Sequence, residues 1–141
     1  MEGLAIKTLD KGALVEKEFE TDVSMAADRF HEKSPKVLST ASLIGIMQTA
    51  CAEMMAPFLN EDEMVVSVKI EMSHFGAVPA GTTVKLRTLV LEVAERRVVF
   101  SVEASDGKQT IASGRNDMFV IDKKRFESGI ERYRAAMEER G

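Results

Sequence analysis

The sequence is poor in the side chains that cross-link proteins. Its 141 residues include one cysteine, Cys51, and two histidines. A single cysteine cannot form a disulfide within the chain, and the nine methionines suit a reducing compartment. The stretch from Met1 to Asp10 lacks the basic-then-apolar pattern of a secretory signal. We therefore expect a cytoplasmic protein.

The sequence also lacks the motifs that mark several common chemistries. It has no glycine-rich phosphate loop, no HExxH, no CxxC pair and no GxSxG elbow. We accordingly expect neither a metal site nor a cofactor. Lysine and arginine number 19 against 23 acidic residues, and no basic run exceeds the three residues 123–125. Because nucleic acid requires a basic face, we do not expect it as a partner.

The chain does contain enough apolar material for one folded domain over residues 1–141. Hydrophobic residues make up 45% and charged residues 30%, close to the average for soluble domains. The segment Val37–Leu59 has Glu53 as its only charge. Its hydroxyl residues, Gln48 and Pro57 are nevertheless typical of a helix buried in protein rather than of a membrane span. We expect no membrane partner.

Hydrophobic periodicity predicts the first elements. Residues 13–23 alternate between apolar and acidic side chains, which predicts a half-buried strand with an apolar face of Ala13, Val15, Phe19 and Val23. An irregular segment, 24–36, follows. Ser39 or Thr40 can then cap a helix that runs to about Leu59. Because the apolar residues of this helix spread nearly all round its axis, we expect it to be buried.

Four more runs have strand character, and turn residues such as Asp106-Gly107 separate them. The runs are 64–75, 82–93, 97–105 and 110–121. Tight turns between successive strands predict an antiparallel sheet. Asp122 can cap a final amphipathic helix, expected to lie on a surface, whose apolar residues are Phe126, Ile130, Tyr133 and Met137. The predicted class is α+β, one antiparallel sheet around a long buried helix.

A few polar residues in apolar surroundings are candidates for chemistry. His74, at the end of a predicted strand, can take and give protons near neutrality, or it can be structural. Thr40 can cap the helix, or lie where helix amides stabilise an oxyanion. Gln48 is either a satisfied core glutamine or a residue that orients water or substrate. We interpret Cys51 as a core residue and His31 as a solvated one.

Three segments of the sequence resemble the fluoroacetyl-CoA thioesterase-like branch of the hotdog-fold thioesterases: Val37–Cys51, Met55–Leu59 and Ser73–Gly81. The resemblance covers most of the chain from Val15 to Phe126. It implies the hotdog fold and hydrolysis of a short acyl-CoA thioester, with CoA as part of the substrate. It also implies a cleft between protomers in a homodimer or a dimer of dimers.

The resemblance assigns roles to individual residues. The family's catalytic hydroxyl, acidic residue and histidine fall on Thr40, Gln48 and His74. The position of a glycine whose backbone faces the thioester falls on Ser67. We expect the acyl pocket to be lined by Leu43, Met47 and Phe75.

The sequence also departs from the family pattern. Gln48 replaces the acidic residue, and an amide cannot act as a nucleophile or a base. Asn116 and Met118 stand where relatives often have a His-x-Arg pattern. A thioesterase with His74 as general base for water or for Thr40 is the first hypothesis. A non-catalytic acyl-CoA or acyl-ligand binder is the second, and a dehydratase of the same fold is a weaker third. The CoA phosphates could meet Arg96, Arg97 or Lys123.

Overall fold

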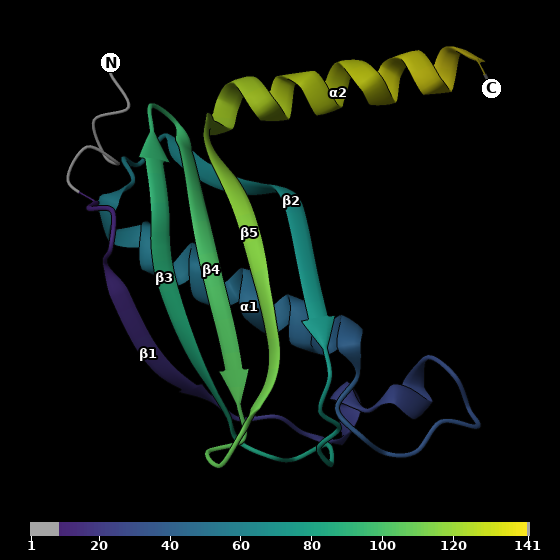
Figure 1. Ribbon diagram of the computed structural model, residues 1–141. Coiled ribbons are helices and arrows are strands. Elements are labelled where there is room, and N and C mark those ends of the chain that lie inside the picture. The colour runs from purple at the N-terminus through teal and green to yellow at the C-terminus, as the bar shows by residue number, and fades with distance from the viewer. Residues whose placement is uncertain (1–8, 141) are drawn as a thin grey trace.

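The computed structural model describes residues 9–140, which form one antiparallel sheet with a long helix across one face (Figure 1). The strand order is β1-β3-β4-β5-β2. This arrangement confirms the predicted α+β class. The main elements are β1 (Leu14–Phe19), α1 (Thr40–Met55), β2 (Glu63–His74), β3 (Val84–Ala94), β4 (Arg97–Ser105), β5 (Thr110–Asp122) and α2 (Lys123–Arg140). The prediction that Met1 to Asp10 carry no secretory signal concerns residues that lie almost wholly outside the described range.

Short turns join β3 to β4 and β4 to β5, as predicted. At the second turn, Asp106 Oδ1 accepts hydrogen bonds from the backbone N–H groups of Lys108 and Gln109 at 2.8 and 2.9 Å. Gly107 has φ 98° there, a left-handed conformation that glycine adopts without steric cost. These turns keep consecutive strands adjacent, and this adjacency produces the antiparallel order.

Helix α1 begins and ends where its local chemistry requires. Ser39, and not Thr40, is the N-cap, because its Oγ accepts the Ser42 N–H at 3.0 Å. Thr40 is therefore the first helical residue. The helix ends at Met55, and a 3-10 turn, Ala56–Phe58, follows it. Pro57 lacks an N–H and its ring clashes with the preceding turn, so it cannot extend the α-helix.

One side of α1 packs against the sheet, and the other side is exposed. Gly45, Gln48 and Thr49 are among the exposed residues. The prediction that α1 is buried on nearly all sides is therefore wrong for a single chain. The sheet covers only one face of the helix, and the uncovered face carries small and polar side chains. The buried residues of the helix are Leu43, Ile46, Met47, Ala50, Cys51 and Met55.

Strand β1 is shorter than predicted. It ends at Phe19, and Val23 is 71% exposed rather than part of the buried face. Asp22 caps the 3-10 turn Val23–Met25 by accepting the Ser24 N–H at 2.8 Å. A capped turn competes with strand pairing, so the chain leaves the sheet before Val23.

Strand β2 is an edge strand. It pairs only with β5, and a bulge between Ser67 and Lys69 leaves Val68 out of register and 56% exposed. No other described strand adjoins its outer edge. Free backbone N–H and C=O groups along such an edge are a template for pairing with another chain.

Helix α2 begins as predicted but does not lie on the sheet. Asp122 Oδ1 caps it by accepting the Arg125 N–H at 2.8 Å. The helix then projects past β2, away from the rest of the chain (Figure 1), and none of its residues is buried. The predicted C-terminal amphipathic helix is therefore present, and among residues 9–140 it is exposed and not packed on the sheet. Of the helices that these residues form, none has the length and apolar composition to span a membrane.

Candidate active site

The side chains of Thr40 and His74 meet at the start of α1. Thr40 Oγ1 lies 2.8 Å from His74 Nδ1. His74 is the last residue of β2, and it pairs with Ala112 on the face of the sheet that packs against α1. A hydroxyl within hydrogen-bond reach of an imidazole is an arrangement suited to proton transfer. The fold therefore brings together two of the three predicted catalytic residues.

The second nitrogen of His74 is available for chemistry. Nε2 is buried and has no hydrogen-bond partner among the described residues. A buried polar atom without a partner is unfavourable, so this nitrogen would gain from a bound water or substrate. The Thr40 side chain is exposed. The pair is therefore accessible from solvent on the hydroxyl side.

The start of α1 supplies electrostatic stabilisation next to this pair. Ser39 accepts hydrogen bonds from two backbone N–H groups of α1. Its Oγ accepts from Ser42, and its carbonyl oxygen accepts from Leu43 at 3.1 Å. The N–H groups of Thr40 and Ala41 belong to the first helical turn and have no acceptor within the helix. Together with the positive end of the helix dipole, such amides can stabilise negative charge that develops on a carbonyl oxygen.

Gln48 does not join Thr40 and His74 within one chain. It lies eight residues after Thr40, which is about 12 Å along the helix axis at ~1.5 Å per residue. Its side chain is exposed, so the interpretation as a core glutamine is wrong. A substrate or a second copy of the chain must bridge that separation for Gln48 to take part.

The residues expected to bind substrate lie in different environments. Ser67 lies on β2 opposite Met118, and its Oγ is buried with no hydrogen-bond partner in the part of the chain that the structure describes. Leu43 and Met47 are 1% and 2% exposed, beside an internal cavity of about 10 Å³. Phe75 is 61% exposed. The single chain therefore contains no open acyl pocket at these four positions, and their predicted role stays a prediction.

Cys51 lies on the buried side of α1, next to Asn116. Burial raises the pKa of the Cys51 thiol to about 11, and the nearby Asn116 amide only partly opposes the shift. The thiol is thus protonated at neutral pH and is no nucleophile. Asn116 is wholly buried, and among the described residues neither of its amide atoms has a hydrogen-bond partner. In the sequence, Asn116 stood out only as a departure from the family pattern. Its position opposite Ile70, on the inward side of β5, indicates burial.

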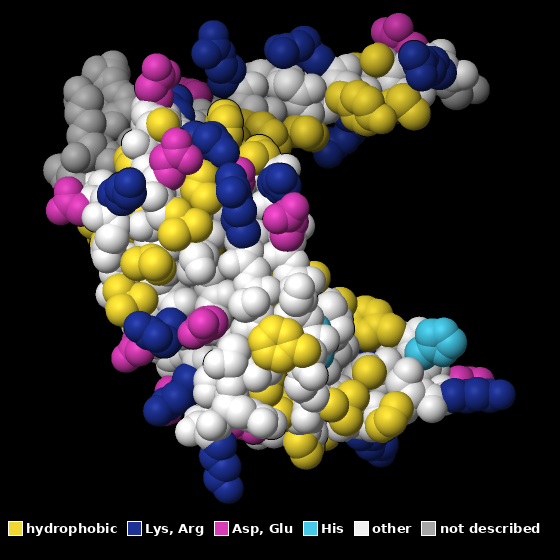
Figure 2. Space-filling model, in the orientation of Figure 1, with side chains coloured by type: hydrophobic (Ala, Val, Ile, Leu, Met, Phe, Trp, Pro, Cys, Tyr) yellow, Lys and Arg dark blue, Asp and Glu magenta, His cyan; other side chains and the backbone are white. Residues whose placement is uncertain are grey.

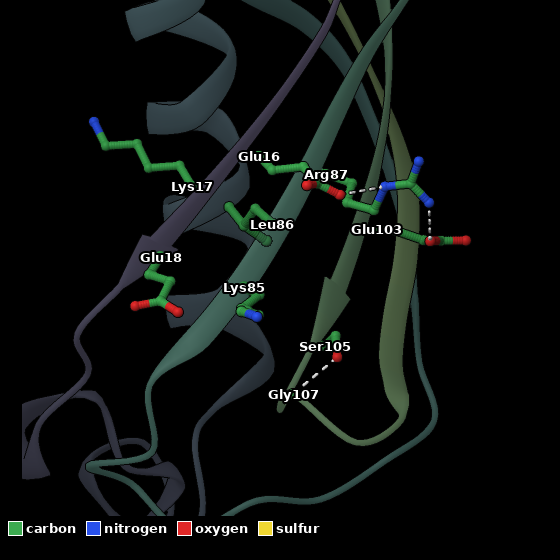
Figure 3. Close-up of a pocket in the computed structure, with 9 residues that line it drawn as sticks. All are labelled: Glu16, Lys17, Glu18, Lys85, Leu86, Arg87, Glu103, Ser105 and Gly107. Atoms are coloured by element: carbon green, nitrogen blue, oxygen red, sulfur yellow. Dashed lines mark hydrogen bonds and ion pairs between the residues drawn. The ribbon is translucent and has the colours of Figure 1, made fainter.

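A separate pocket of about 360 Å³ opens on the face of the sheet away from α1 (Figure 3). Three of its charged side chains pair with one another. Arg87 Nε lies 2.9 Å from Glu16, and Arg87 Nη1 lies 3.9 Å from Glu103. The pocket contains no paired nucleophile and base, so it is not the candidate site.

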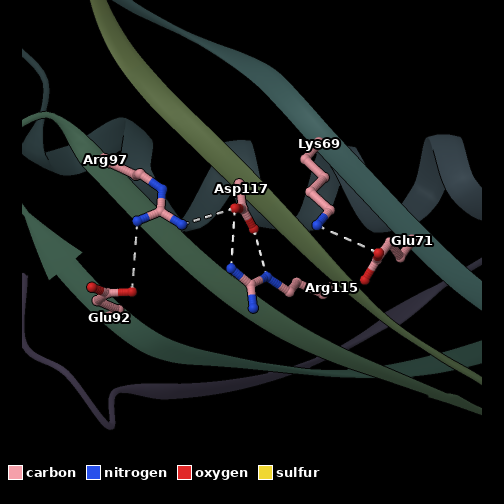
Figure 4. Close-up of polar contacts among 6 residues, drawn as sticks. All are labelled: Lys69, Glu71, Glu92, Arg97, Arg115 and Asp117. Carbon is pink, nitrogen blue, oxygen red and sulfur yellow. Dashed lines mark hydrogen bonds and ion pairs between the residues drawn. The ribbon is translucent and has the colours of Figure 1, made fainter.

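The same face carries a charged network on β4 and β5 (Figure 4). Asp117 accepts hydrogen bonds from Arg115 at 2.8 Å and from Arg97 at 3.1 Å. The hydrogen bond from Arg115 is the main reason that the pKa of the Asp117 carboxyl lies below its usual value. Arg97 is therefore committed to Asp117 and to Glu92, which weakens its predicted role in binding CoA. Among residues 9–140, no three His, Cys, Asp or Glu side chains are grouped to hold a metal ion.

The fold and the Thr40–His74 contact define a hotdog-fold thioesterase. The structure matches that of the fluoroacetyl-CoA thioesterase FlK with a TM-score of 0.82 and 27% identity, over 88% of this chain and 96% of that chain. A FlK variant in complex with fluoroacetate and CoA matches with a TM-score of 0.76 and 28% identity, over 84% and 99%. A thioesterase superfamily member from Thermus thermophilus shares the fold, with a TM-score of 0.85 and 24% identity over 94% and 98%.

The chain belongs to the family of fluoroacetyl-CoA-specific thioesterases. The family pattern matches residues 21–124. The fluoroacetyl-CoA thioesterase of Streptantibioticus cattleyicolor is 33% identical over 96 residues, which are 68% of this chain and 69% of that enzyme. These matches confirm the predicted hotdog fold and family branch. They also confirm that the protein is a thioester hydrolase.

Proposed function

We propose that the protein hydrolyses short acyl-CoA thioesters in a cleft that forms between two copies of the chain. The contact between Thr40 Oγ1 and His74 Nδ1, 2.8 Å long and at a helix start, carries this proposal. It places a proton acceptor, a hydroxyl and free amides within one turn of α1. CoA enters as part of the substrate, and the reaction needs no further cofactor.

The two nitrogens of His74 suggest how the reaction proceeds. If Nδ1–H donates to Thr40 Oγ1, the unpaired Nε2 is the free base. Nε2 then takes a proton from water as the water oxygen attacks the thioester carbon. The first-turn amides stabilise the oxyanion, the carbon–sulfur bond breaks, and the leaving CoA thiolate receives the proton from His74.

A covalent route through Thr40 uses the other tautomer. In that route Nδ1 accepts the Thr40 hydroxyl proton, Thr40 becomes acylated, and water later hydrolyses the ester. Gln48 cannot supply a second base for the hydrolysis step. We therefore favour direct attack by water, with Gln48 orienting water or substrate.

The cleft requires a second copy because the outer edge of β2 has no partner strand among residues 9–140. Val68 on this strand and Phe75 directly after it are 56% and 61% exposed. Antiparallel pairing of two β2 strands would close this edge and produce a homodimer. Light scattering at micromolar concentration should show at least a dimer, and a stable monomer would remove the interfacial cleft. We place the protein in the cytoplasm, where the free thiol of Cys51 stays reduced.

Replacement of each histidine tests the catalytic assignment. Thiol release from a panel of acyl-CoAs should fall at least ~100-fold in His74→Ala, the lower end of what a positioned acid–base group contributes. His31→Ala, the same change in an exposed segment, should stay close to the parent. If folded His74→Ala is as fast as the parent, His74 is structural. If the parent binds acyl-CoA without releasing thiol, the protein is an acyl-CoA binder.

A further inference from the structure

The apolar side of α2 has no partner among residues 9–140 of its own chain. Its stripe consists of Phe126, Ile130, Tyr133 and Met137, which are 43%, 45%, 67% and 46% exposed. These residues recur every three or four positions and so lie on one side of the helix. A regular apolar stripe left in water is unfavourable. We therefore expect the stripe to pack against an apolar surface outside its own chain.

A second exposed apolar cluster lies at the opposite end of β2. We call it the apolar arm, and it consists of Val23, Phe30 and Phe75, which are 71%, 66% and 61% exposed. Backbone hydrogen bonds hold the segment that contains the first two of these beside the start of α1, since Ala27 N–H donates to Val37 O and Ser39 N–H donates to Met25 O. This segment is thus anchored next to Thr40.

The two clusters border one hollow in the molecular surface. Figure 2 shows α2 above the hollow and the segment between β1 and α1 below it, with hydrophobic side chains along both borders. The free edge of β2 runs between them (Figure 1). A partner that pairs with this edge therefore enters the hollow and meets both clusters.

Two-fold symmetry makes the clusters complementary. When two β2 strands pair in antiparallel fashion with full overlap, Glu63 of one copy lies beside His74 of the other. Helix α2 starts next to Glu63, because Glu63 pairs with Asp122 and Lys123 N–H donates to Asp62 O at 2.8 Å. The stripe of each copy then extends over the end of β2 in the other copy, where the apolar arm lies.

The length of α2 suits this reach. Its 18 residues span about 27 Å at ~1.5 Å per residue, several times the spacing of ~4.8 Å between neighbouring strands. We propose that α2 is a clasp: its apolar stripe packs on the apolar arm of a second copy and covers that copy's Thr40–His74 site. This inference rests on the dimer in the proposed function.

The clasp gives α2 a place in substrate binding. The first turn of the helix carries Lys123, Lys124 and Arg125. In the two-fold dimer, this turn lies beside the other copy's His74. Cations at the mouth of the cleft would attract the phosphates of CoA. Loss of the clasp should therefore raise KM for acyl-CoA more than it lowers kcat.

Cross-linking tests the contact directly, because Cys51 is the only native cysteine and is fully buried. The variant Phe30→Cys/Tyr133→Cys, treated with a short bis-maleimide, should give a covalent species of twice the chain mass. The control is Phe30→Cys/Ala135→Cys, in which the new α2 cysteine lies on the opposite side of the same helix. It should give little cross-linking. Equal yields from both variants, or cross-linking only within one chain, would overturn the clasp.

Matched charge variants test how much the clasp stabilises the dimer. Ile130→Asp/Met137→Asp should raise the dimer dissociation constant at least ~10-fold, a change of ~1.4 kcal/mol. Ser128→Asp/Ala135→Asp adds the same charges to the exposed side of the helix away from the stripe and should change the constant little. If the protein is a dimer and both variants dissociate equally, the clasp fails while the proposed dimer stands.

The remaining outcomes are also decisive. If the cross-linked clasp dimer forms but the parent hydrolyses no acyl-CoA, the proposed function fails and the clasp stands. If the parent is monomeric at all concentrations, the dimer and the clasp fail together. If the stripe variants convert a tetramer to a dimer, α2 joins two dimers instead, and the clasp is wrong.

Discussion

The two helices differ far more in environment than in length. Helix α1 has 16 residues and α2 has 18. Six residues of α1 are buried against the sheet, whereas none of α2 is buried. An apolar residue stabilises the chain only where an apolar surface covers it. The comparison therefore separates contacts that fold the chain from contacts that require another molecule.

The two faces of the sheet show the same difference. The face under α1 is apolar. Among residues 9–140, no helix covers the other face (Figure 1), which carries a network of charged side chains (Figure 4). On the open face, the side chains form hydrogen-bonded ion pairs and do not pack against a helix. Asp117 accepts hydrogen bonds from two arginines, Arg97 and Arg115. Four pairs of substitutions test these contrasts.

The largest effect should come from shortening a buried methionine. Met55 in α1 is 0% exposed, so Met55→Ala should lower the free energy of unfolding by about 3 kcal/mol through lost burial and a cavity. Met137→Ala in α2 should cost under ~1 kcal/mol, and only at concentrations where copies associate. Urea denaturation at several protein concentrations measures both. Equal losses that do not depend on concentration would mean that α2 packs on its own chain.

Two glycines probe how closely α1 approaches the sheet. A Cβ on Gly114 would lie 2.4 Å from Glu71 O and 2.5 Å from Met47 Cε, so Gly114→Ala should cost about 2 kcal/mol through overpacking. Gly45, on the exposed side of α1, has no atom within 4 Å of that position. Gly45→Ala should instead stabilise the helix by about 1 kcal/mol. Thermal denaturation of both variants checks the sign, and a neutral Gly114→Ala would contradict the close packing.

On the open face, Asp117→Asn should remove a pH-dependent contribution to stability. The folded-state pKa of Asp117 is lowered. Its contribution is therefore full above the unfolded value of ~3.9 and is lost as pH falls through the folded pKa. The variant should be less stable by about 1–2 kcal/mol at pH 7, and the difference should shrink by pH 3.

The control for this test is Glu92→Gln. Glu92 lies 3.7 Å from Arg97 and its side chain is 55% exposed, so its removal should cost under ~0.5 kcal/mol. Urea denaturation at pH 7 and pH 3 provides the measurement. A loss for Asp117→Asn that is the same at both pH values would show that the carboxylate charge is not the cause.

The smallest effect concerns the exposed side of α1. Gln48→Glu should raise turnover by up to about tenfold if the site lacks only a carboxylate base. Gln109→Glu, the same change in an exposed hairpin, should leave turnover unchanged. A folded Gln48→Glu protein that binds acyl-CoA but hydrolyses it no faster between pH 5 and 9 would mean that Gln48 is a hydrogen-bond donor or only a surface residue.

Much of the fold was predictable from local chemistry. The turn at Asp106-Gly107 and the cap at Asp122 each depend on residues close together in sequence. The end of α1 was predicted near Leu59, but the helix ends at Met55, two residues before Pro57. The early exit of β1 before Val23 was not predicted, because the alternation of apolar and acidic side chains continues through Val23. In the structure, the turn capped by Asp22 has already taken the backbone out of the sheet at that point. A periodic pattern does not reveal where pairing stops.

The sequence by itself determined the element order, the antiparallel sheet and the catalytic candidates, because turns, caps and periodicity act over a few residues. Only the tertiary structure decided that Thr40 meets His74, since that contact joins a helix start to a strand end 34 residues away. It also decided that Gln48 and the α2 stripe face outward. Amphipathic patterns state that a side chain requires an apolar neighbour, but they do not state whether the neighbour belongs to the same chain.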